Sequence, residues 1–327
     1  MFSRTADAVS AVVQSYTDLA EGVYHLGRID EAADLLARAS GVALDLPDQH
    51  PCVPRLLNRL GVIRSRQGRH VEAERLLKRA VGIFDRAPET PGLDLSTALA
   101  NLGMVYRAMG RGAQARAAYE RALGIAEVSV GKSGLIVAWT LDQIGDLEAS
   151  EGNVPSAVFT LRRSLAIKEK LLGAADWDLA VTLNRLAELY LKQERYGDAE
   201  AFLLRVVTIR ERILGWGDPA MAKPLLRLGR LYVKQRKEGR AEQLVRYALK
   251  LLAEVLPPDH PEIIGCLNLL TEIYRGLSRY ADADVLWELT QRLADGTERA
   301  DKIKPFVLPT PPRMFGPGGP VLEPGQA

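Results

Sequence analysis

The stretch from Leu183 to Val206, LNRLAELYLKQERYGDAEAFLLRV, carries the pattern that decides the fold. Before Glu194, apolar or small residues stand at Leu183, Leu186, Ala187 and Tyr190. After it, they stand at Ala199, Phe202, Leu203 and Val206. Both sets follow the i, i+3, i+4, i+7 spacing of one helix face. The stretch therefore predicts two antiparallel amphipathic helices, A and B, with a turn at Glu194.

The same turn recurs along the chain at a nearly constant period. Its position is taken by Gly27, Gly68, Gly110, Gly152, Glu194, Arg236 and Ser278. The successive steps are 41, 42, 42, 42, 42 and 42 residues. Positions within a repeat are numbered from this turn residue, negative before it and positive after it. A fixed period of this length indicates a repeat architecture.

Two further positions hold small residues in register with the turn. Position +5 is an alanine in every repeat: Ala32, Ala73, Ala115, Ala157, Ala199, Ala241 and Ala283. Position −7 holds Ala20, Gly61, Gly103, Gly145, Ala187, Gly229 and Thr271. Small side chains at fixed places allow two helices to approach closely. The sequence thus predicts an all-α, right-handed superhelical solenoid of seven helical hairpins over residues 1–294. Pro219 and Pro224 predict a shifted start or a kink in helix A of repeat six.

This combination of small residue, turn and alanine resembles the tetratricopeptide repeat from residue 8 to about residue 294. The period of 42 residues and the links Leu214–Pro219 and Leu256–Pro261 resemble the long-repeat subfamily of kinesin light chain and its bacterial relatives. The start of helix A in that subfamily, Leu-Asn-x-Leu-Ala, is matched closely by Leu183–Ala187 and Leu57–Gly61, and poorly in repeats one and four. The resemblance implies a scaffold whose concave groove binds other proteins.

Composition limits the class of protein and of partner. With 47% hydrophobic and 26% charged residues, and no run of about 18 apolar residues, the chain is expected to be soluble and not to span a membrane. The formal charge of +2 lacks the broad positive field of nucleic-acid-binding proteins. The opening residues MFSRTADAVS lack an export signal, which predicts a cytoplasmic protein. Cys52 and Cys266 fall in repeats two and seven, too far apart for a disulfide.

No motif in the sequence makes a case for an enzyme, a cofactor or a metal site. Residues 126–133 fit the loose phosphate-loop expression, but they form the link between repeats three and four instead of following a strand. The histidines lie at turns or links without metal-ligand spacing: His25, His50, His70 and His260. For His260, helix capping is the preferred interpretation.

Candidate binding residues form a stripe on helix A at positions of about −13, −10, −9, −6 and −2, which in the family lines the groove. The candidates are Asn58, Arg59, Asn101, Asn184, Arg185, Lys192, Lys223, Arg227, Arg230 and Lys234. Amides can bond an extended peptide backbone, and guanidinium groups suit carboxylates. The alternative is that these are the solvated polar faces of helices. The binding interpretation is favoured in repeats five and six.

The last part of the chain differs in composition from the repeats. Residues 295–304 are predicted to be a charged linker, and residues 305–327 a tail rich in Pro and Gly. From Lys304 onward we expect neither helix nor packed core.

Two functions remain open on this basis. The first is a non-enzymatic adaptor that binds an acidic or carboxylate-bearing peptide or protein, alone or within a larger assembly. The second is a regulatory or sensory protein that changes curvature when a small ligand or a signalling peptide binds. The sequence leaves the oligomeric state open.

Overall fold

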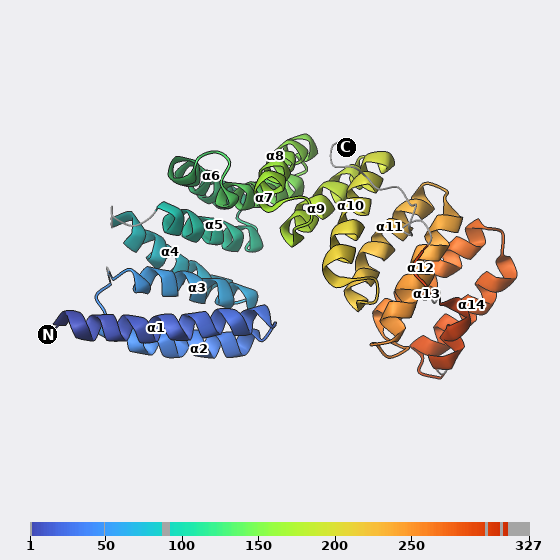
Figure 1. The fold of residues 1–327 in the computed structure, drawn as a ribbon, viewed down its shortest axis with the longest axis horizontal. Coiled ribbons are helices and arrows are strands. Elements are labelled where there is room, and N and C mark those ends of the chain that lie inside the picture. The colour runs from blue at the N-terminus through green and yellow to red at the C-terminus, as the bar shows by residue number, and fades with distance from the viewer. Residues whose placement is uncertain (1, 49, 87–91, 298–299, 308–309, 313–327) are drawn as a thin grey trace. The chain divides into compact units, whose positions relative to one another are not determined.

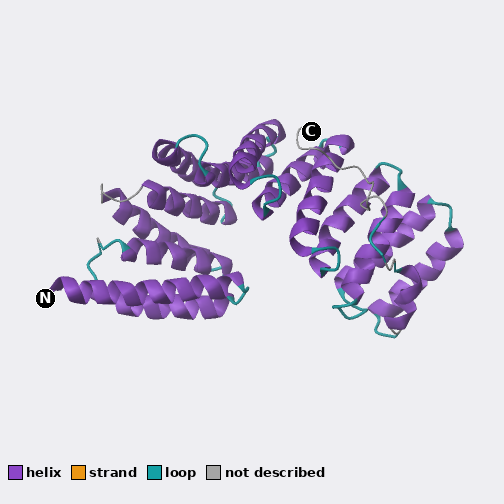
Figure 2. Cartoon of the chain, in the orientation of Figure 1, coloured by secondary structure: helices purple, strands orange, loops and turns teal. Residues whose placement is uncertain are grey.

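The computed structural model describes residues 2–48, 50–86, 92–297, 300–307 and 310–312. These residues form α-helices and short 3-10 helices, with no strand among them (Figures 1 and 2). The α-helices are α1 (Phe2–His25), α2 (Ile29–Val42), α3 (Cys52–Arg66), α4 (His70–Arg86), α5 (Gly92–Ala108), α6 (Gly112–Val130), α7 (Leu135–Ser150), α8 (Val154–Leu172), α9 (Trp177–Lys192), α10 (Tyr196–Leu214), α11 (Ala222–Lys234), α12 (Glu238–Ala253), α13 (Pro261–Gly276) and α14 (Tyr280–Ala294). The 3-10 helices are η1 (Ala43–Asp45), η2 (Pro219–Met221) and η3 (Ala300–Phe306). The prediction of an all-α chain of seven consecutive helix pairs is confirmed, and the handedness of the stack stays a prediction.

The chain divides into two compact units, residues 1–167 and residues 168–327. In the first unit, α1 packs on α2, α3 on α4 and α5 on α6, and each pair contacts the next through α2 with α3, α4 with α5 and α6 with α7. In the second unit, α9 packs on α10, α11 on α12 and α13 on α14, joined through α10 with α11 and α12 with α13. Within each unit, neighbouring hairpins thus stack directly on one another. In the first unit the buried apolar residues form one large cluster, from Val13 to Leu147, and a smaller one that includes Val137 and Ile167.

All seven predicted turn positions have a left-handed backbone. Gly27, Gly68, Gly110 and Gly152 have φ between 73° and 82°, and Glu194, Arg236 and Ser278 have φ of 57° to 59°. The residue after each turn donates its amide to a carbonyl five residues earlier, for example Arg195 to Tyr190 at 2.9 Å. This is the Schellman ending of a helix, which satisfies carbonyls left open by the last turn.

The small residues at positions −7 and +5 lie where A and B helices touch. A Cβ added to Gly61 would come within 2.7 Å of Leu77, and one added to Gly145 within 2.7 Å of Leu161. The alanines at position +5 are buried in all seven repeats. A larger side chain at either position would push the two helices apart.

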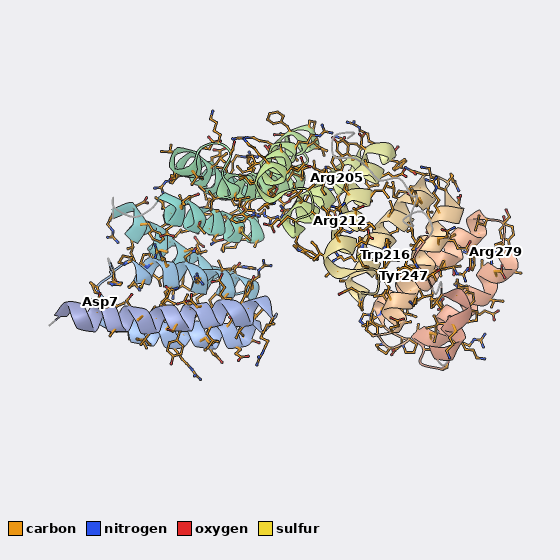
Figure 3. All side chains as sticks on the ribbon, viewed as in Figure 1. Asp7, Arg205, Arg212, Trp216, Tyr247 and Arg279 are labelled. Carbon is orange, nitrogen blue, oxygen red and sulfur yellow. The ribbon has the colours of Figure 1, made fainter. Side chains whose placement is uncertain are left out.

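Repeat six begins late, as its prolines predict. The 3-10 helix η2 starts at Pro219, behind an Asp218 side chain that accepts from the amide of Ala220 at 2.7 Å, and α11 follows from Ala222. The link between α10 and η2 is bonded to α12, since the Tyr247 hydroxyl of α12 donates to the Trp216 carbonyl of the link at 3.0 Å (Figure 3).

Two ladders of ion pairs join successive B helices. One links an arginine at position +11 to an acid at +17 of the repeat before: Arg121 to Asp85, Arg163 to Glu127 and Arg205 to Glu169. The other links a cation at +1 to a glutamate at +6: Arg111 to Glu74, Lys237 to Glu200 and Arg279 to Glu242, at 2.9 to 3.1 Å. Within each ladder, the same two repeat positions therefore pair between one repeat and the next.

The segment after α14 is more ordered than its composition suggests. The helix η3 includes residues 304–306, so the expectation of no helix from Lys304 onward is wrong for them. Ile303 is only 3% exposed, and Arg246 of α12 donates to the carbonyls of Pro305, Phe306 and Val307 at 3.1 to 3.3 Å. Residues 313–327 lie outside the described residues. The boundaries at 294 and 304 stay predictions.

Candidate functional site

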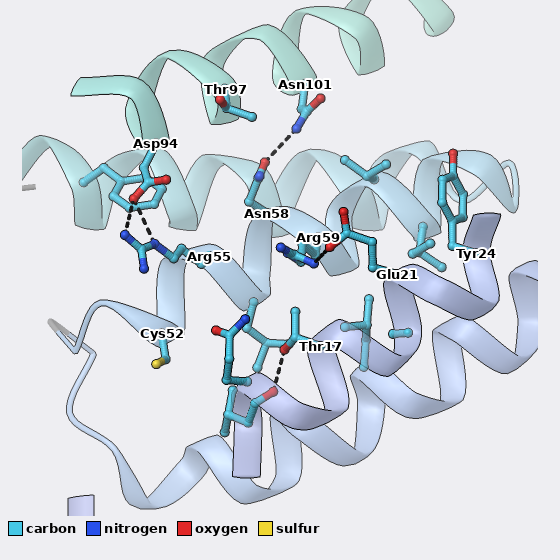
Figure 4. A pocket seen from close by; sticks show the side chains of 18 residues that line it. Thr17, Glu21, Tyr24, Cys52, Arg55, Asn58, Arg59, Asp94, Thr97 and Asn101 are labelled. Carbon is cyan, nitrogen blue, oxygen red and sulfur yellow. Dashed lines mark hydrogen bonds and ion pairs between the residues drawn. The ribbon is translucent and has the colours of Figure 1, made fainter. Parts of the chain in front are cut away.

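Each unit contains a cavity lined by the predicted stripe of helix A. In the first unit a cavity of about 590 Å³ lies over α1, α3 and α5 (Figure 4). In the second a cavity of about 230 Å³ lies over α9 and α11. Their polar linings come from equivalent repeat positions, for example Arg55 and Lys223 at −13, Asn58 and Asn184 at −10, and Arg59 and Arg227 at −9.

The polar groups of the larger cavity are bonded to one another across repeats. Arg55 of α3 reaches Asp94 of α5 at 2.8 Å, and Arg59 of α3 pairs with Glu21 of α1 (Figure 4). The side-chain amide of Asn101 donates to that of Asn58 at 3.0 Å, so one hydrogen bond between amides joins repeats two and three. Two cations therefore face two carboxylates, and this cavity has no excess of positive charge. Asp94 lies at position −16, outside the predicted stripe, which is why the pairing was not predicted.

The smaller cavity has a different charge balance. Its lining consists of Val181, Asn184, Arg185, Glu188, Arg210, Lys223, Pro224 and Arg227. Four cations thus accompany one carboxylate. Arg227 donates to Asn184 and lies next to Glu188, both at 2.9 Å, while Asn184 also donates to the carbonyl of Ala180 at 2.7 Å. The amide and the guanidinium are thereby fixed in one orientation at the cavity wall.

Arg210 is a lining residue that the sequence pattern did not predict. It comes from helix B, α10, where it donates to the carbonyl of Ala220 at 3.2 Å and its guanidinium lies 4.8 Å from the centre of the Trp177 ring. Its Nε is buried and has no acceptor among the described residues. Burial lowers the pKa of Arg210, and the charge of nearby Arg227 lowers this pKa further. A guanidinium nevertheless stays charged in proteins, so the cavity holds a second, partly desolvated positive charge beside Arg227.

The signal for Arg210 lies in the register of helix B. Position +16 is apolar in five repeats: Ala43, Phe84, Ala126, Leu252 and Ala294. It is cationic only at Lys168 and Arg210. Phe84 lines the larger cavity at the place that Arg210 takes in the smaller one. A cation at a core position is a departure that a search for helix A residues alone does not reveal.

The ten predicted residues divide into three groups. Asn58, Arg59 and Asn101 line the larger cavity, and Asn184, Arg185, Lys223 and Arg227 line the smaller one. Lys192, Arg230 and Lys234 are exposed and line neither.

The motifs considered for other chemistry occupy ordinary structural places. Lys132 follows helix α6 instead of a strand and is exposed. His260 caps α13, since its Nδ1 accepts from the amide of Glu262 at 3.2 Å, as its position predicts. Cys52 and Cys266 are both free thiols, and the structure shows no cluster of metal-ligating side chains in the part of the chain that it describes. In that same part, none of the helices has the length and the apolar character needed to cross a lipid bilayer.

The family model of the tetratricopeptide repeat matches residues 11–86, 94–170 and 178–254. Among solved structures, nearly identical repeats of a kinesin light chain from Podospora anserina are 20% identical, with 64% of this chain and 99% of that chain covered and a TM-score of 0.57. RapI in its apo form is 14% identical over 90% of this chain and 79% of its own, with a TM-score of 0.70. The apo quorum sensor NprR of B. thuringiensis is 16% identical over 86% and 76%, with a TM-score of 0.64. No curated protein matches the sequence significantly. With three matches that together cover most of its repeats, the chain belongs to the tetratricopeptide repeat family.

Proposed function

We propose that this chain is a non-enzymatic scaffold or adaptor that binds an acidic or carboxylate-bearing segment of a partner protein. The binding site is the cavity of repeats five and six. The observation that supports this most is the lining of four cations and one carboxylate, in contrast to the balanced lining of the equivalent cavity in repeats one to three. The scaffold acts in the cytoplasm, either alone or within a larger assembly.

The chemistry of the lining suits a carboxylate. Arg185, Arg210 and Arg227 carry planar guanidinium groups, which pair with carboxylates through two parallel hydrogen bonds. Asn184 places an amide beside them, suited to the backbone of an extended peptide. Because neither Arg210 nor Arg227 is fully exposed, their charges are less screened than those on an open surface.

The size of the cavity limits what can enter it. Its volume of about 230 Å³ is below the roughly 300–1,000 Å³ that encloses a drug-sized molecule or cofactor. One acidic side chain or a chain terminus fits, with the rest of the peptide lying along helix A. Affinity then comes from several modest contacts, in the micromolar range of about −8 kcal/mol.

The fold similarity to RapI and to the quorum sensor NprR favours a second candidate, a regulatory or sensory protein. In that case the same cavity would bind a small acidic signal, and binding would change the curvature of the repeats. The two candidates differ in the size of the ligand.

The test compares two double variants with the same change of charge. Lys223→Glu with Arg227→Glu reverses two charges in the cavity, and Lys192→Glu with Lys234→Glu reverses two exposed charges outside it. Partners are purified from the native host with the wild type and with each variant, identified by mass spectrometry, and then titrated as purified proteins or peptides.

We expect the cavity variant to lose its acidic partner, with a dissociation constant raised at least about tenfold, and the control variant to keep it. Wild-type binding should weaken as salt is raised. A partner that both variants bind equally well, at low and high salt, would place the interface on another surface.

A further inference from the structure

The face of helix A that stacks on the preceding hairpin is apolar in the later repeats except for two buried threonines, Thr140 and Thr182. It consists of positions −15, −12, −8 and −5, for example Val53, Leu56, Leu60 and Ile63 in repeat two and Ile263, Cys266, Leu270 and Ile273 in repeat seven. All eight of these residues are buried. They lie on α3, which packs against α2, and on α13, which packs against α12. We refer to these four positions as the stacking face.

In repeat one the stacking face is exposed and has a single polar residue, Ser15. Its residues are Val12, Ser15, Leu19 and Gly22 of α1, all on the surface among the described residues. Val12 is 44% exposed and Leu19 is 55% exposed. The last helix of the repeats, α14, exposes more polar residues, since Asp284, Glu288 and Gln291 lie beside the exposed Val285 and Trp287. End repeats need a polar outer face to stay soluble as single chains, and only Ser15 is polar among these four positions of α1.

The exposed stripe of α1 alternates large and small residues at heptad spacing. The large residues are Val12, Leu19 and, directly after the helix, Leu26, which is 74% exposed. The small ones are Ala8, Ser15 and Gly22. Each set has a spacing of seven residues, as positions a and d have in a coiled coil.

This order makes the stripe complementary to itself when two copies run antiparallel. A two-fold axis at the middle of the stripe would set Val12 opposite Gly22, Leu19 opposite Ser15 and Leu26 opposite Ala8. A large residue then meets a small one in every layer, which lets two helices approach closely without voids. Two-fold symmetry repeats each contact on both sides of the axis.

We propose that the chain forms a homodimer through this face, with α1 antiparallel to α1 of a second copy. Another hairpin stacked on α1 fits the sequence less well, since position −5 is a buried aliphatic residue in every later repeat and a glycine only in repeat one. The aliphatic residues are Ile63, Val105, Leu147, Leu189, Leu231 and Ile273. The inference is independent of the cavity of repeats five and six.

One charge lies close to the proposed axis and gives the dimer a salt dependence. Asp18 is exposed beside the stripe, where it accepts from Gln14 at 2.7 Å. The two copies of Asp18 would approach across the axis and repel each other. Salt screens this repulsion, so dimerisation should strengthen as salt is raised, in contrast to the binding of an acidic partner.

The mass of the full chain in solution tests the proposal. Sedimentation or light scattering over about a hundredfold range of concentration should show a shift from the monomer mass of 35.9 kDa toward twice that value. Leu19→Glu should hold the chain at the monomer mass. Val71→Glu, which places the same charge at an exposed valine on α4, should dimerise like the wild type.

A second variant separates the contact from folding. A Cβ at Gly22 would meet nothing within 4 Å in the monomer, so Gly22→Leu should fold normally with an unchanged helical spectrum. It would place a large residue opposite Val12 and should raise the dimer dissociation constant at least about tenfold. A monomer at every concentration, or a dimer that neither Leu19→Glu nor Gly22→Leu weakens, overturns the proposal.

Cross-linking tests the antiparallel direction in a Cys52→Ser background. Ser15→Cys in one copy and Leu19→Cys in the other should form a disulfide when mixed and oxidised, because these positions face each other. Ser15→Cys alone should not, since in the antiparallel arrangement each Ser15 faces Leu19. Efficient cross-linking of Ser15→Cys alone would show a parallel arrangement and overturn the proposed one.

Discussion

Arg210 and Phe84 occupy the same position of their repeats, sixteen residues after the turn, and each lines the cavity of its own unit. One position therefore makes the wall of one cavity apolar and that of the other cationic. Replacing Arg210 by Phe copies the residue of the larger cavity into the smaller one. Because a partly buried charge is costly, the melting temperature of Arg210→Phe should equal or exceed that of the wild type.

The same variant should lose affinity for an acidic partner by about tenfold or more, as expected when one charged contact of a ligand is removed. Thermal unfolding followed by circular dichroism and titration of the purified partner measure the two effects. Phe84→Leu serves as the control for a volume change at this position. A lower melting temperature with unchanged affinity would make Arg210 a structural residue.

The close contact between helices A and B predicts the effect of a large residue at position +5. Ala199 is fully buried between α9 and α10, so Ala199→Arg forces a charged chain into a packed contact. We expect the free energy of unfolding to fall by about 3 kcal/mol or more. Ala281→Arg, on the exposed side of α14, should change it by no more than about 0.5 kcal/mol. Chemical denaturation measures both, and equal effects would contradict the register.

The contact of Arg246 with three successive carbonyls predicts local protection of the segment after α14. Lys302 is an exposed trypsin site within η3, whereas trypsin does not cleave the Lys304–Pro305 bond. In Arg246→Ala the segment should detach more often, and cleavage there should become several-fold faster. Global stability should fall by only about 1–2 kcal/mol, mostly from the loosened burial of Ile303. Arg240→Ala on the same helix is the control, and equal cleavage rates in both would show that the contact contributes little.

The two thiols should differ in reactivity. Burial raises the pKa of Cys266 to about 12, with a smaller contribution from the charge of Glu262, so its thiolate is scarce at neutral pH. Ellman's reagent should therefore modify only Cys52 in the native protein and both thiols after unfolding. Rapid modification of two thiols in the native protein would contradict the burial of Cys266.

The same raised pKa has a consequence for stability. Between the ordinary thiol pKa of 9.0 and about 12, the folded chain holds the Cys266 proton that the unfolded chain has lost. The contribution of the protonated Cys266 thiol to the free energy of unfolding is therefore fully present below pH 9 and is lost as pH rises from 9 to about 12. Cys266→Ala should flatten the alkaline decline measured by thermal unfolding at a series of pH values.

Local backbone requirements explain why the fold could be predicted from the sequence. A left-handed turn requires glycine or a tolerant residue, and a close contact between helices requires alanine or glycine, so Gly61, Ala73 and their equivalents recur at a fixed period. The candidate site was harder to predict because charge depends on neighbours from other repeats. Arg59 was predicted as a binding residue, yet Glu21 of the neighbouring repeat neutralises it, and Asp94 neutralises Arg55. The ordered turn at η3 depends on Arg246, sixty residues before Phe306, which a local reading of proline content does not include.

The ion-pair ladders of the B helices limit how many residues such a chain can gain or lose at once. Arg121 meets Asp85, and Arg163 meets Glu127, over a separation of 36 residues in both cases. If one complete 42-residue repeat were removed, the arginine at +11 of the following repeat would meet the acid at +17 of the repeat before the deletion, and the ion pair would be kept. Removal of half a repeat would bring an A helix to the place of a B helix and leave both charges unmatched. Gain and loss of length in this lineage should therefore occur in whole repeats.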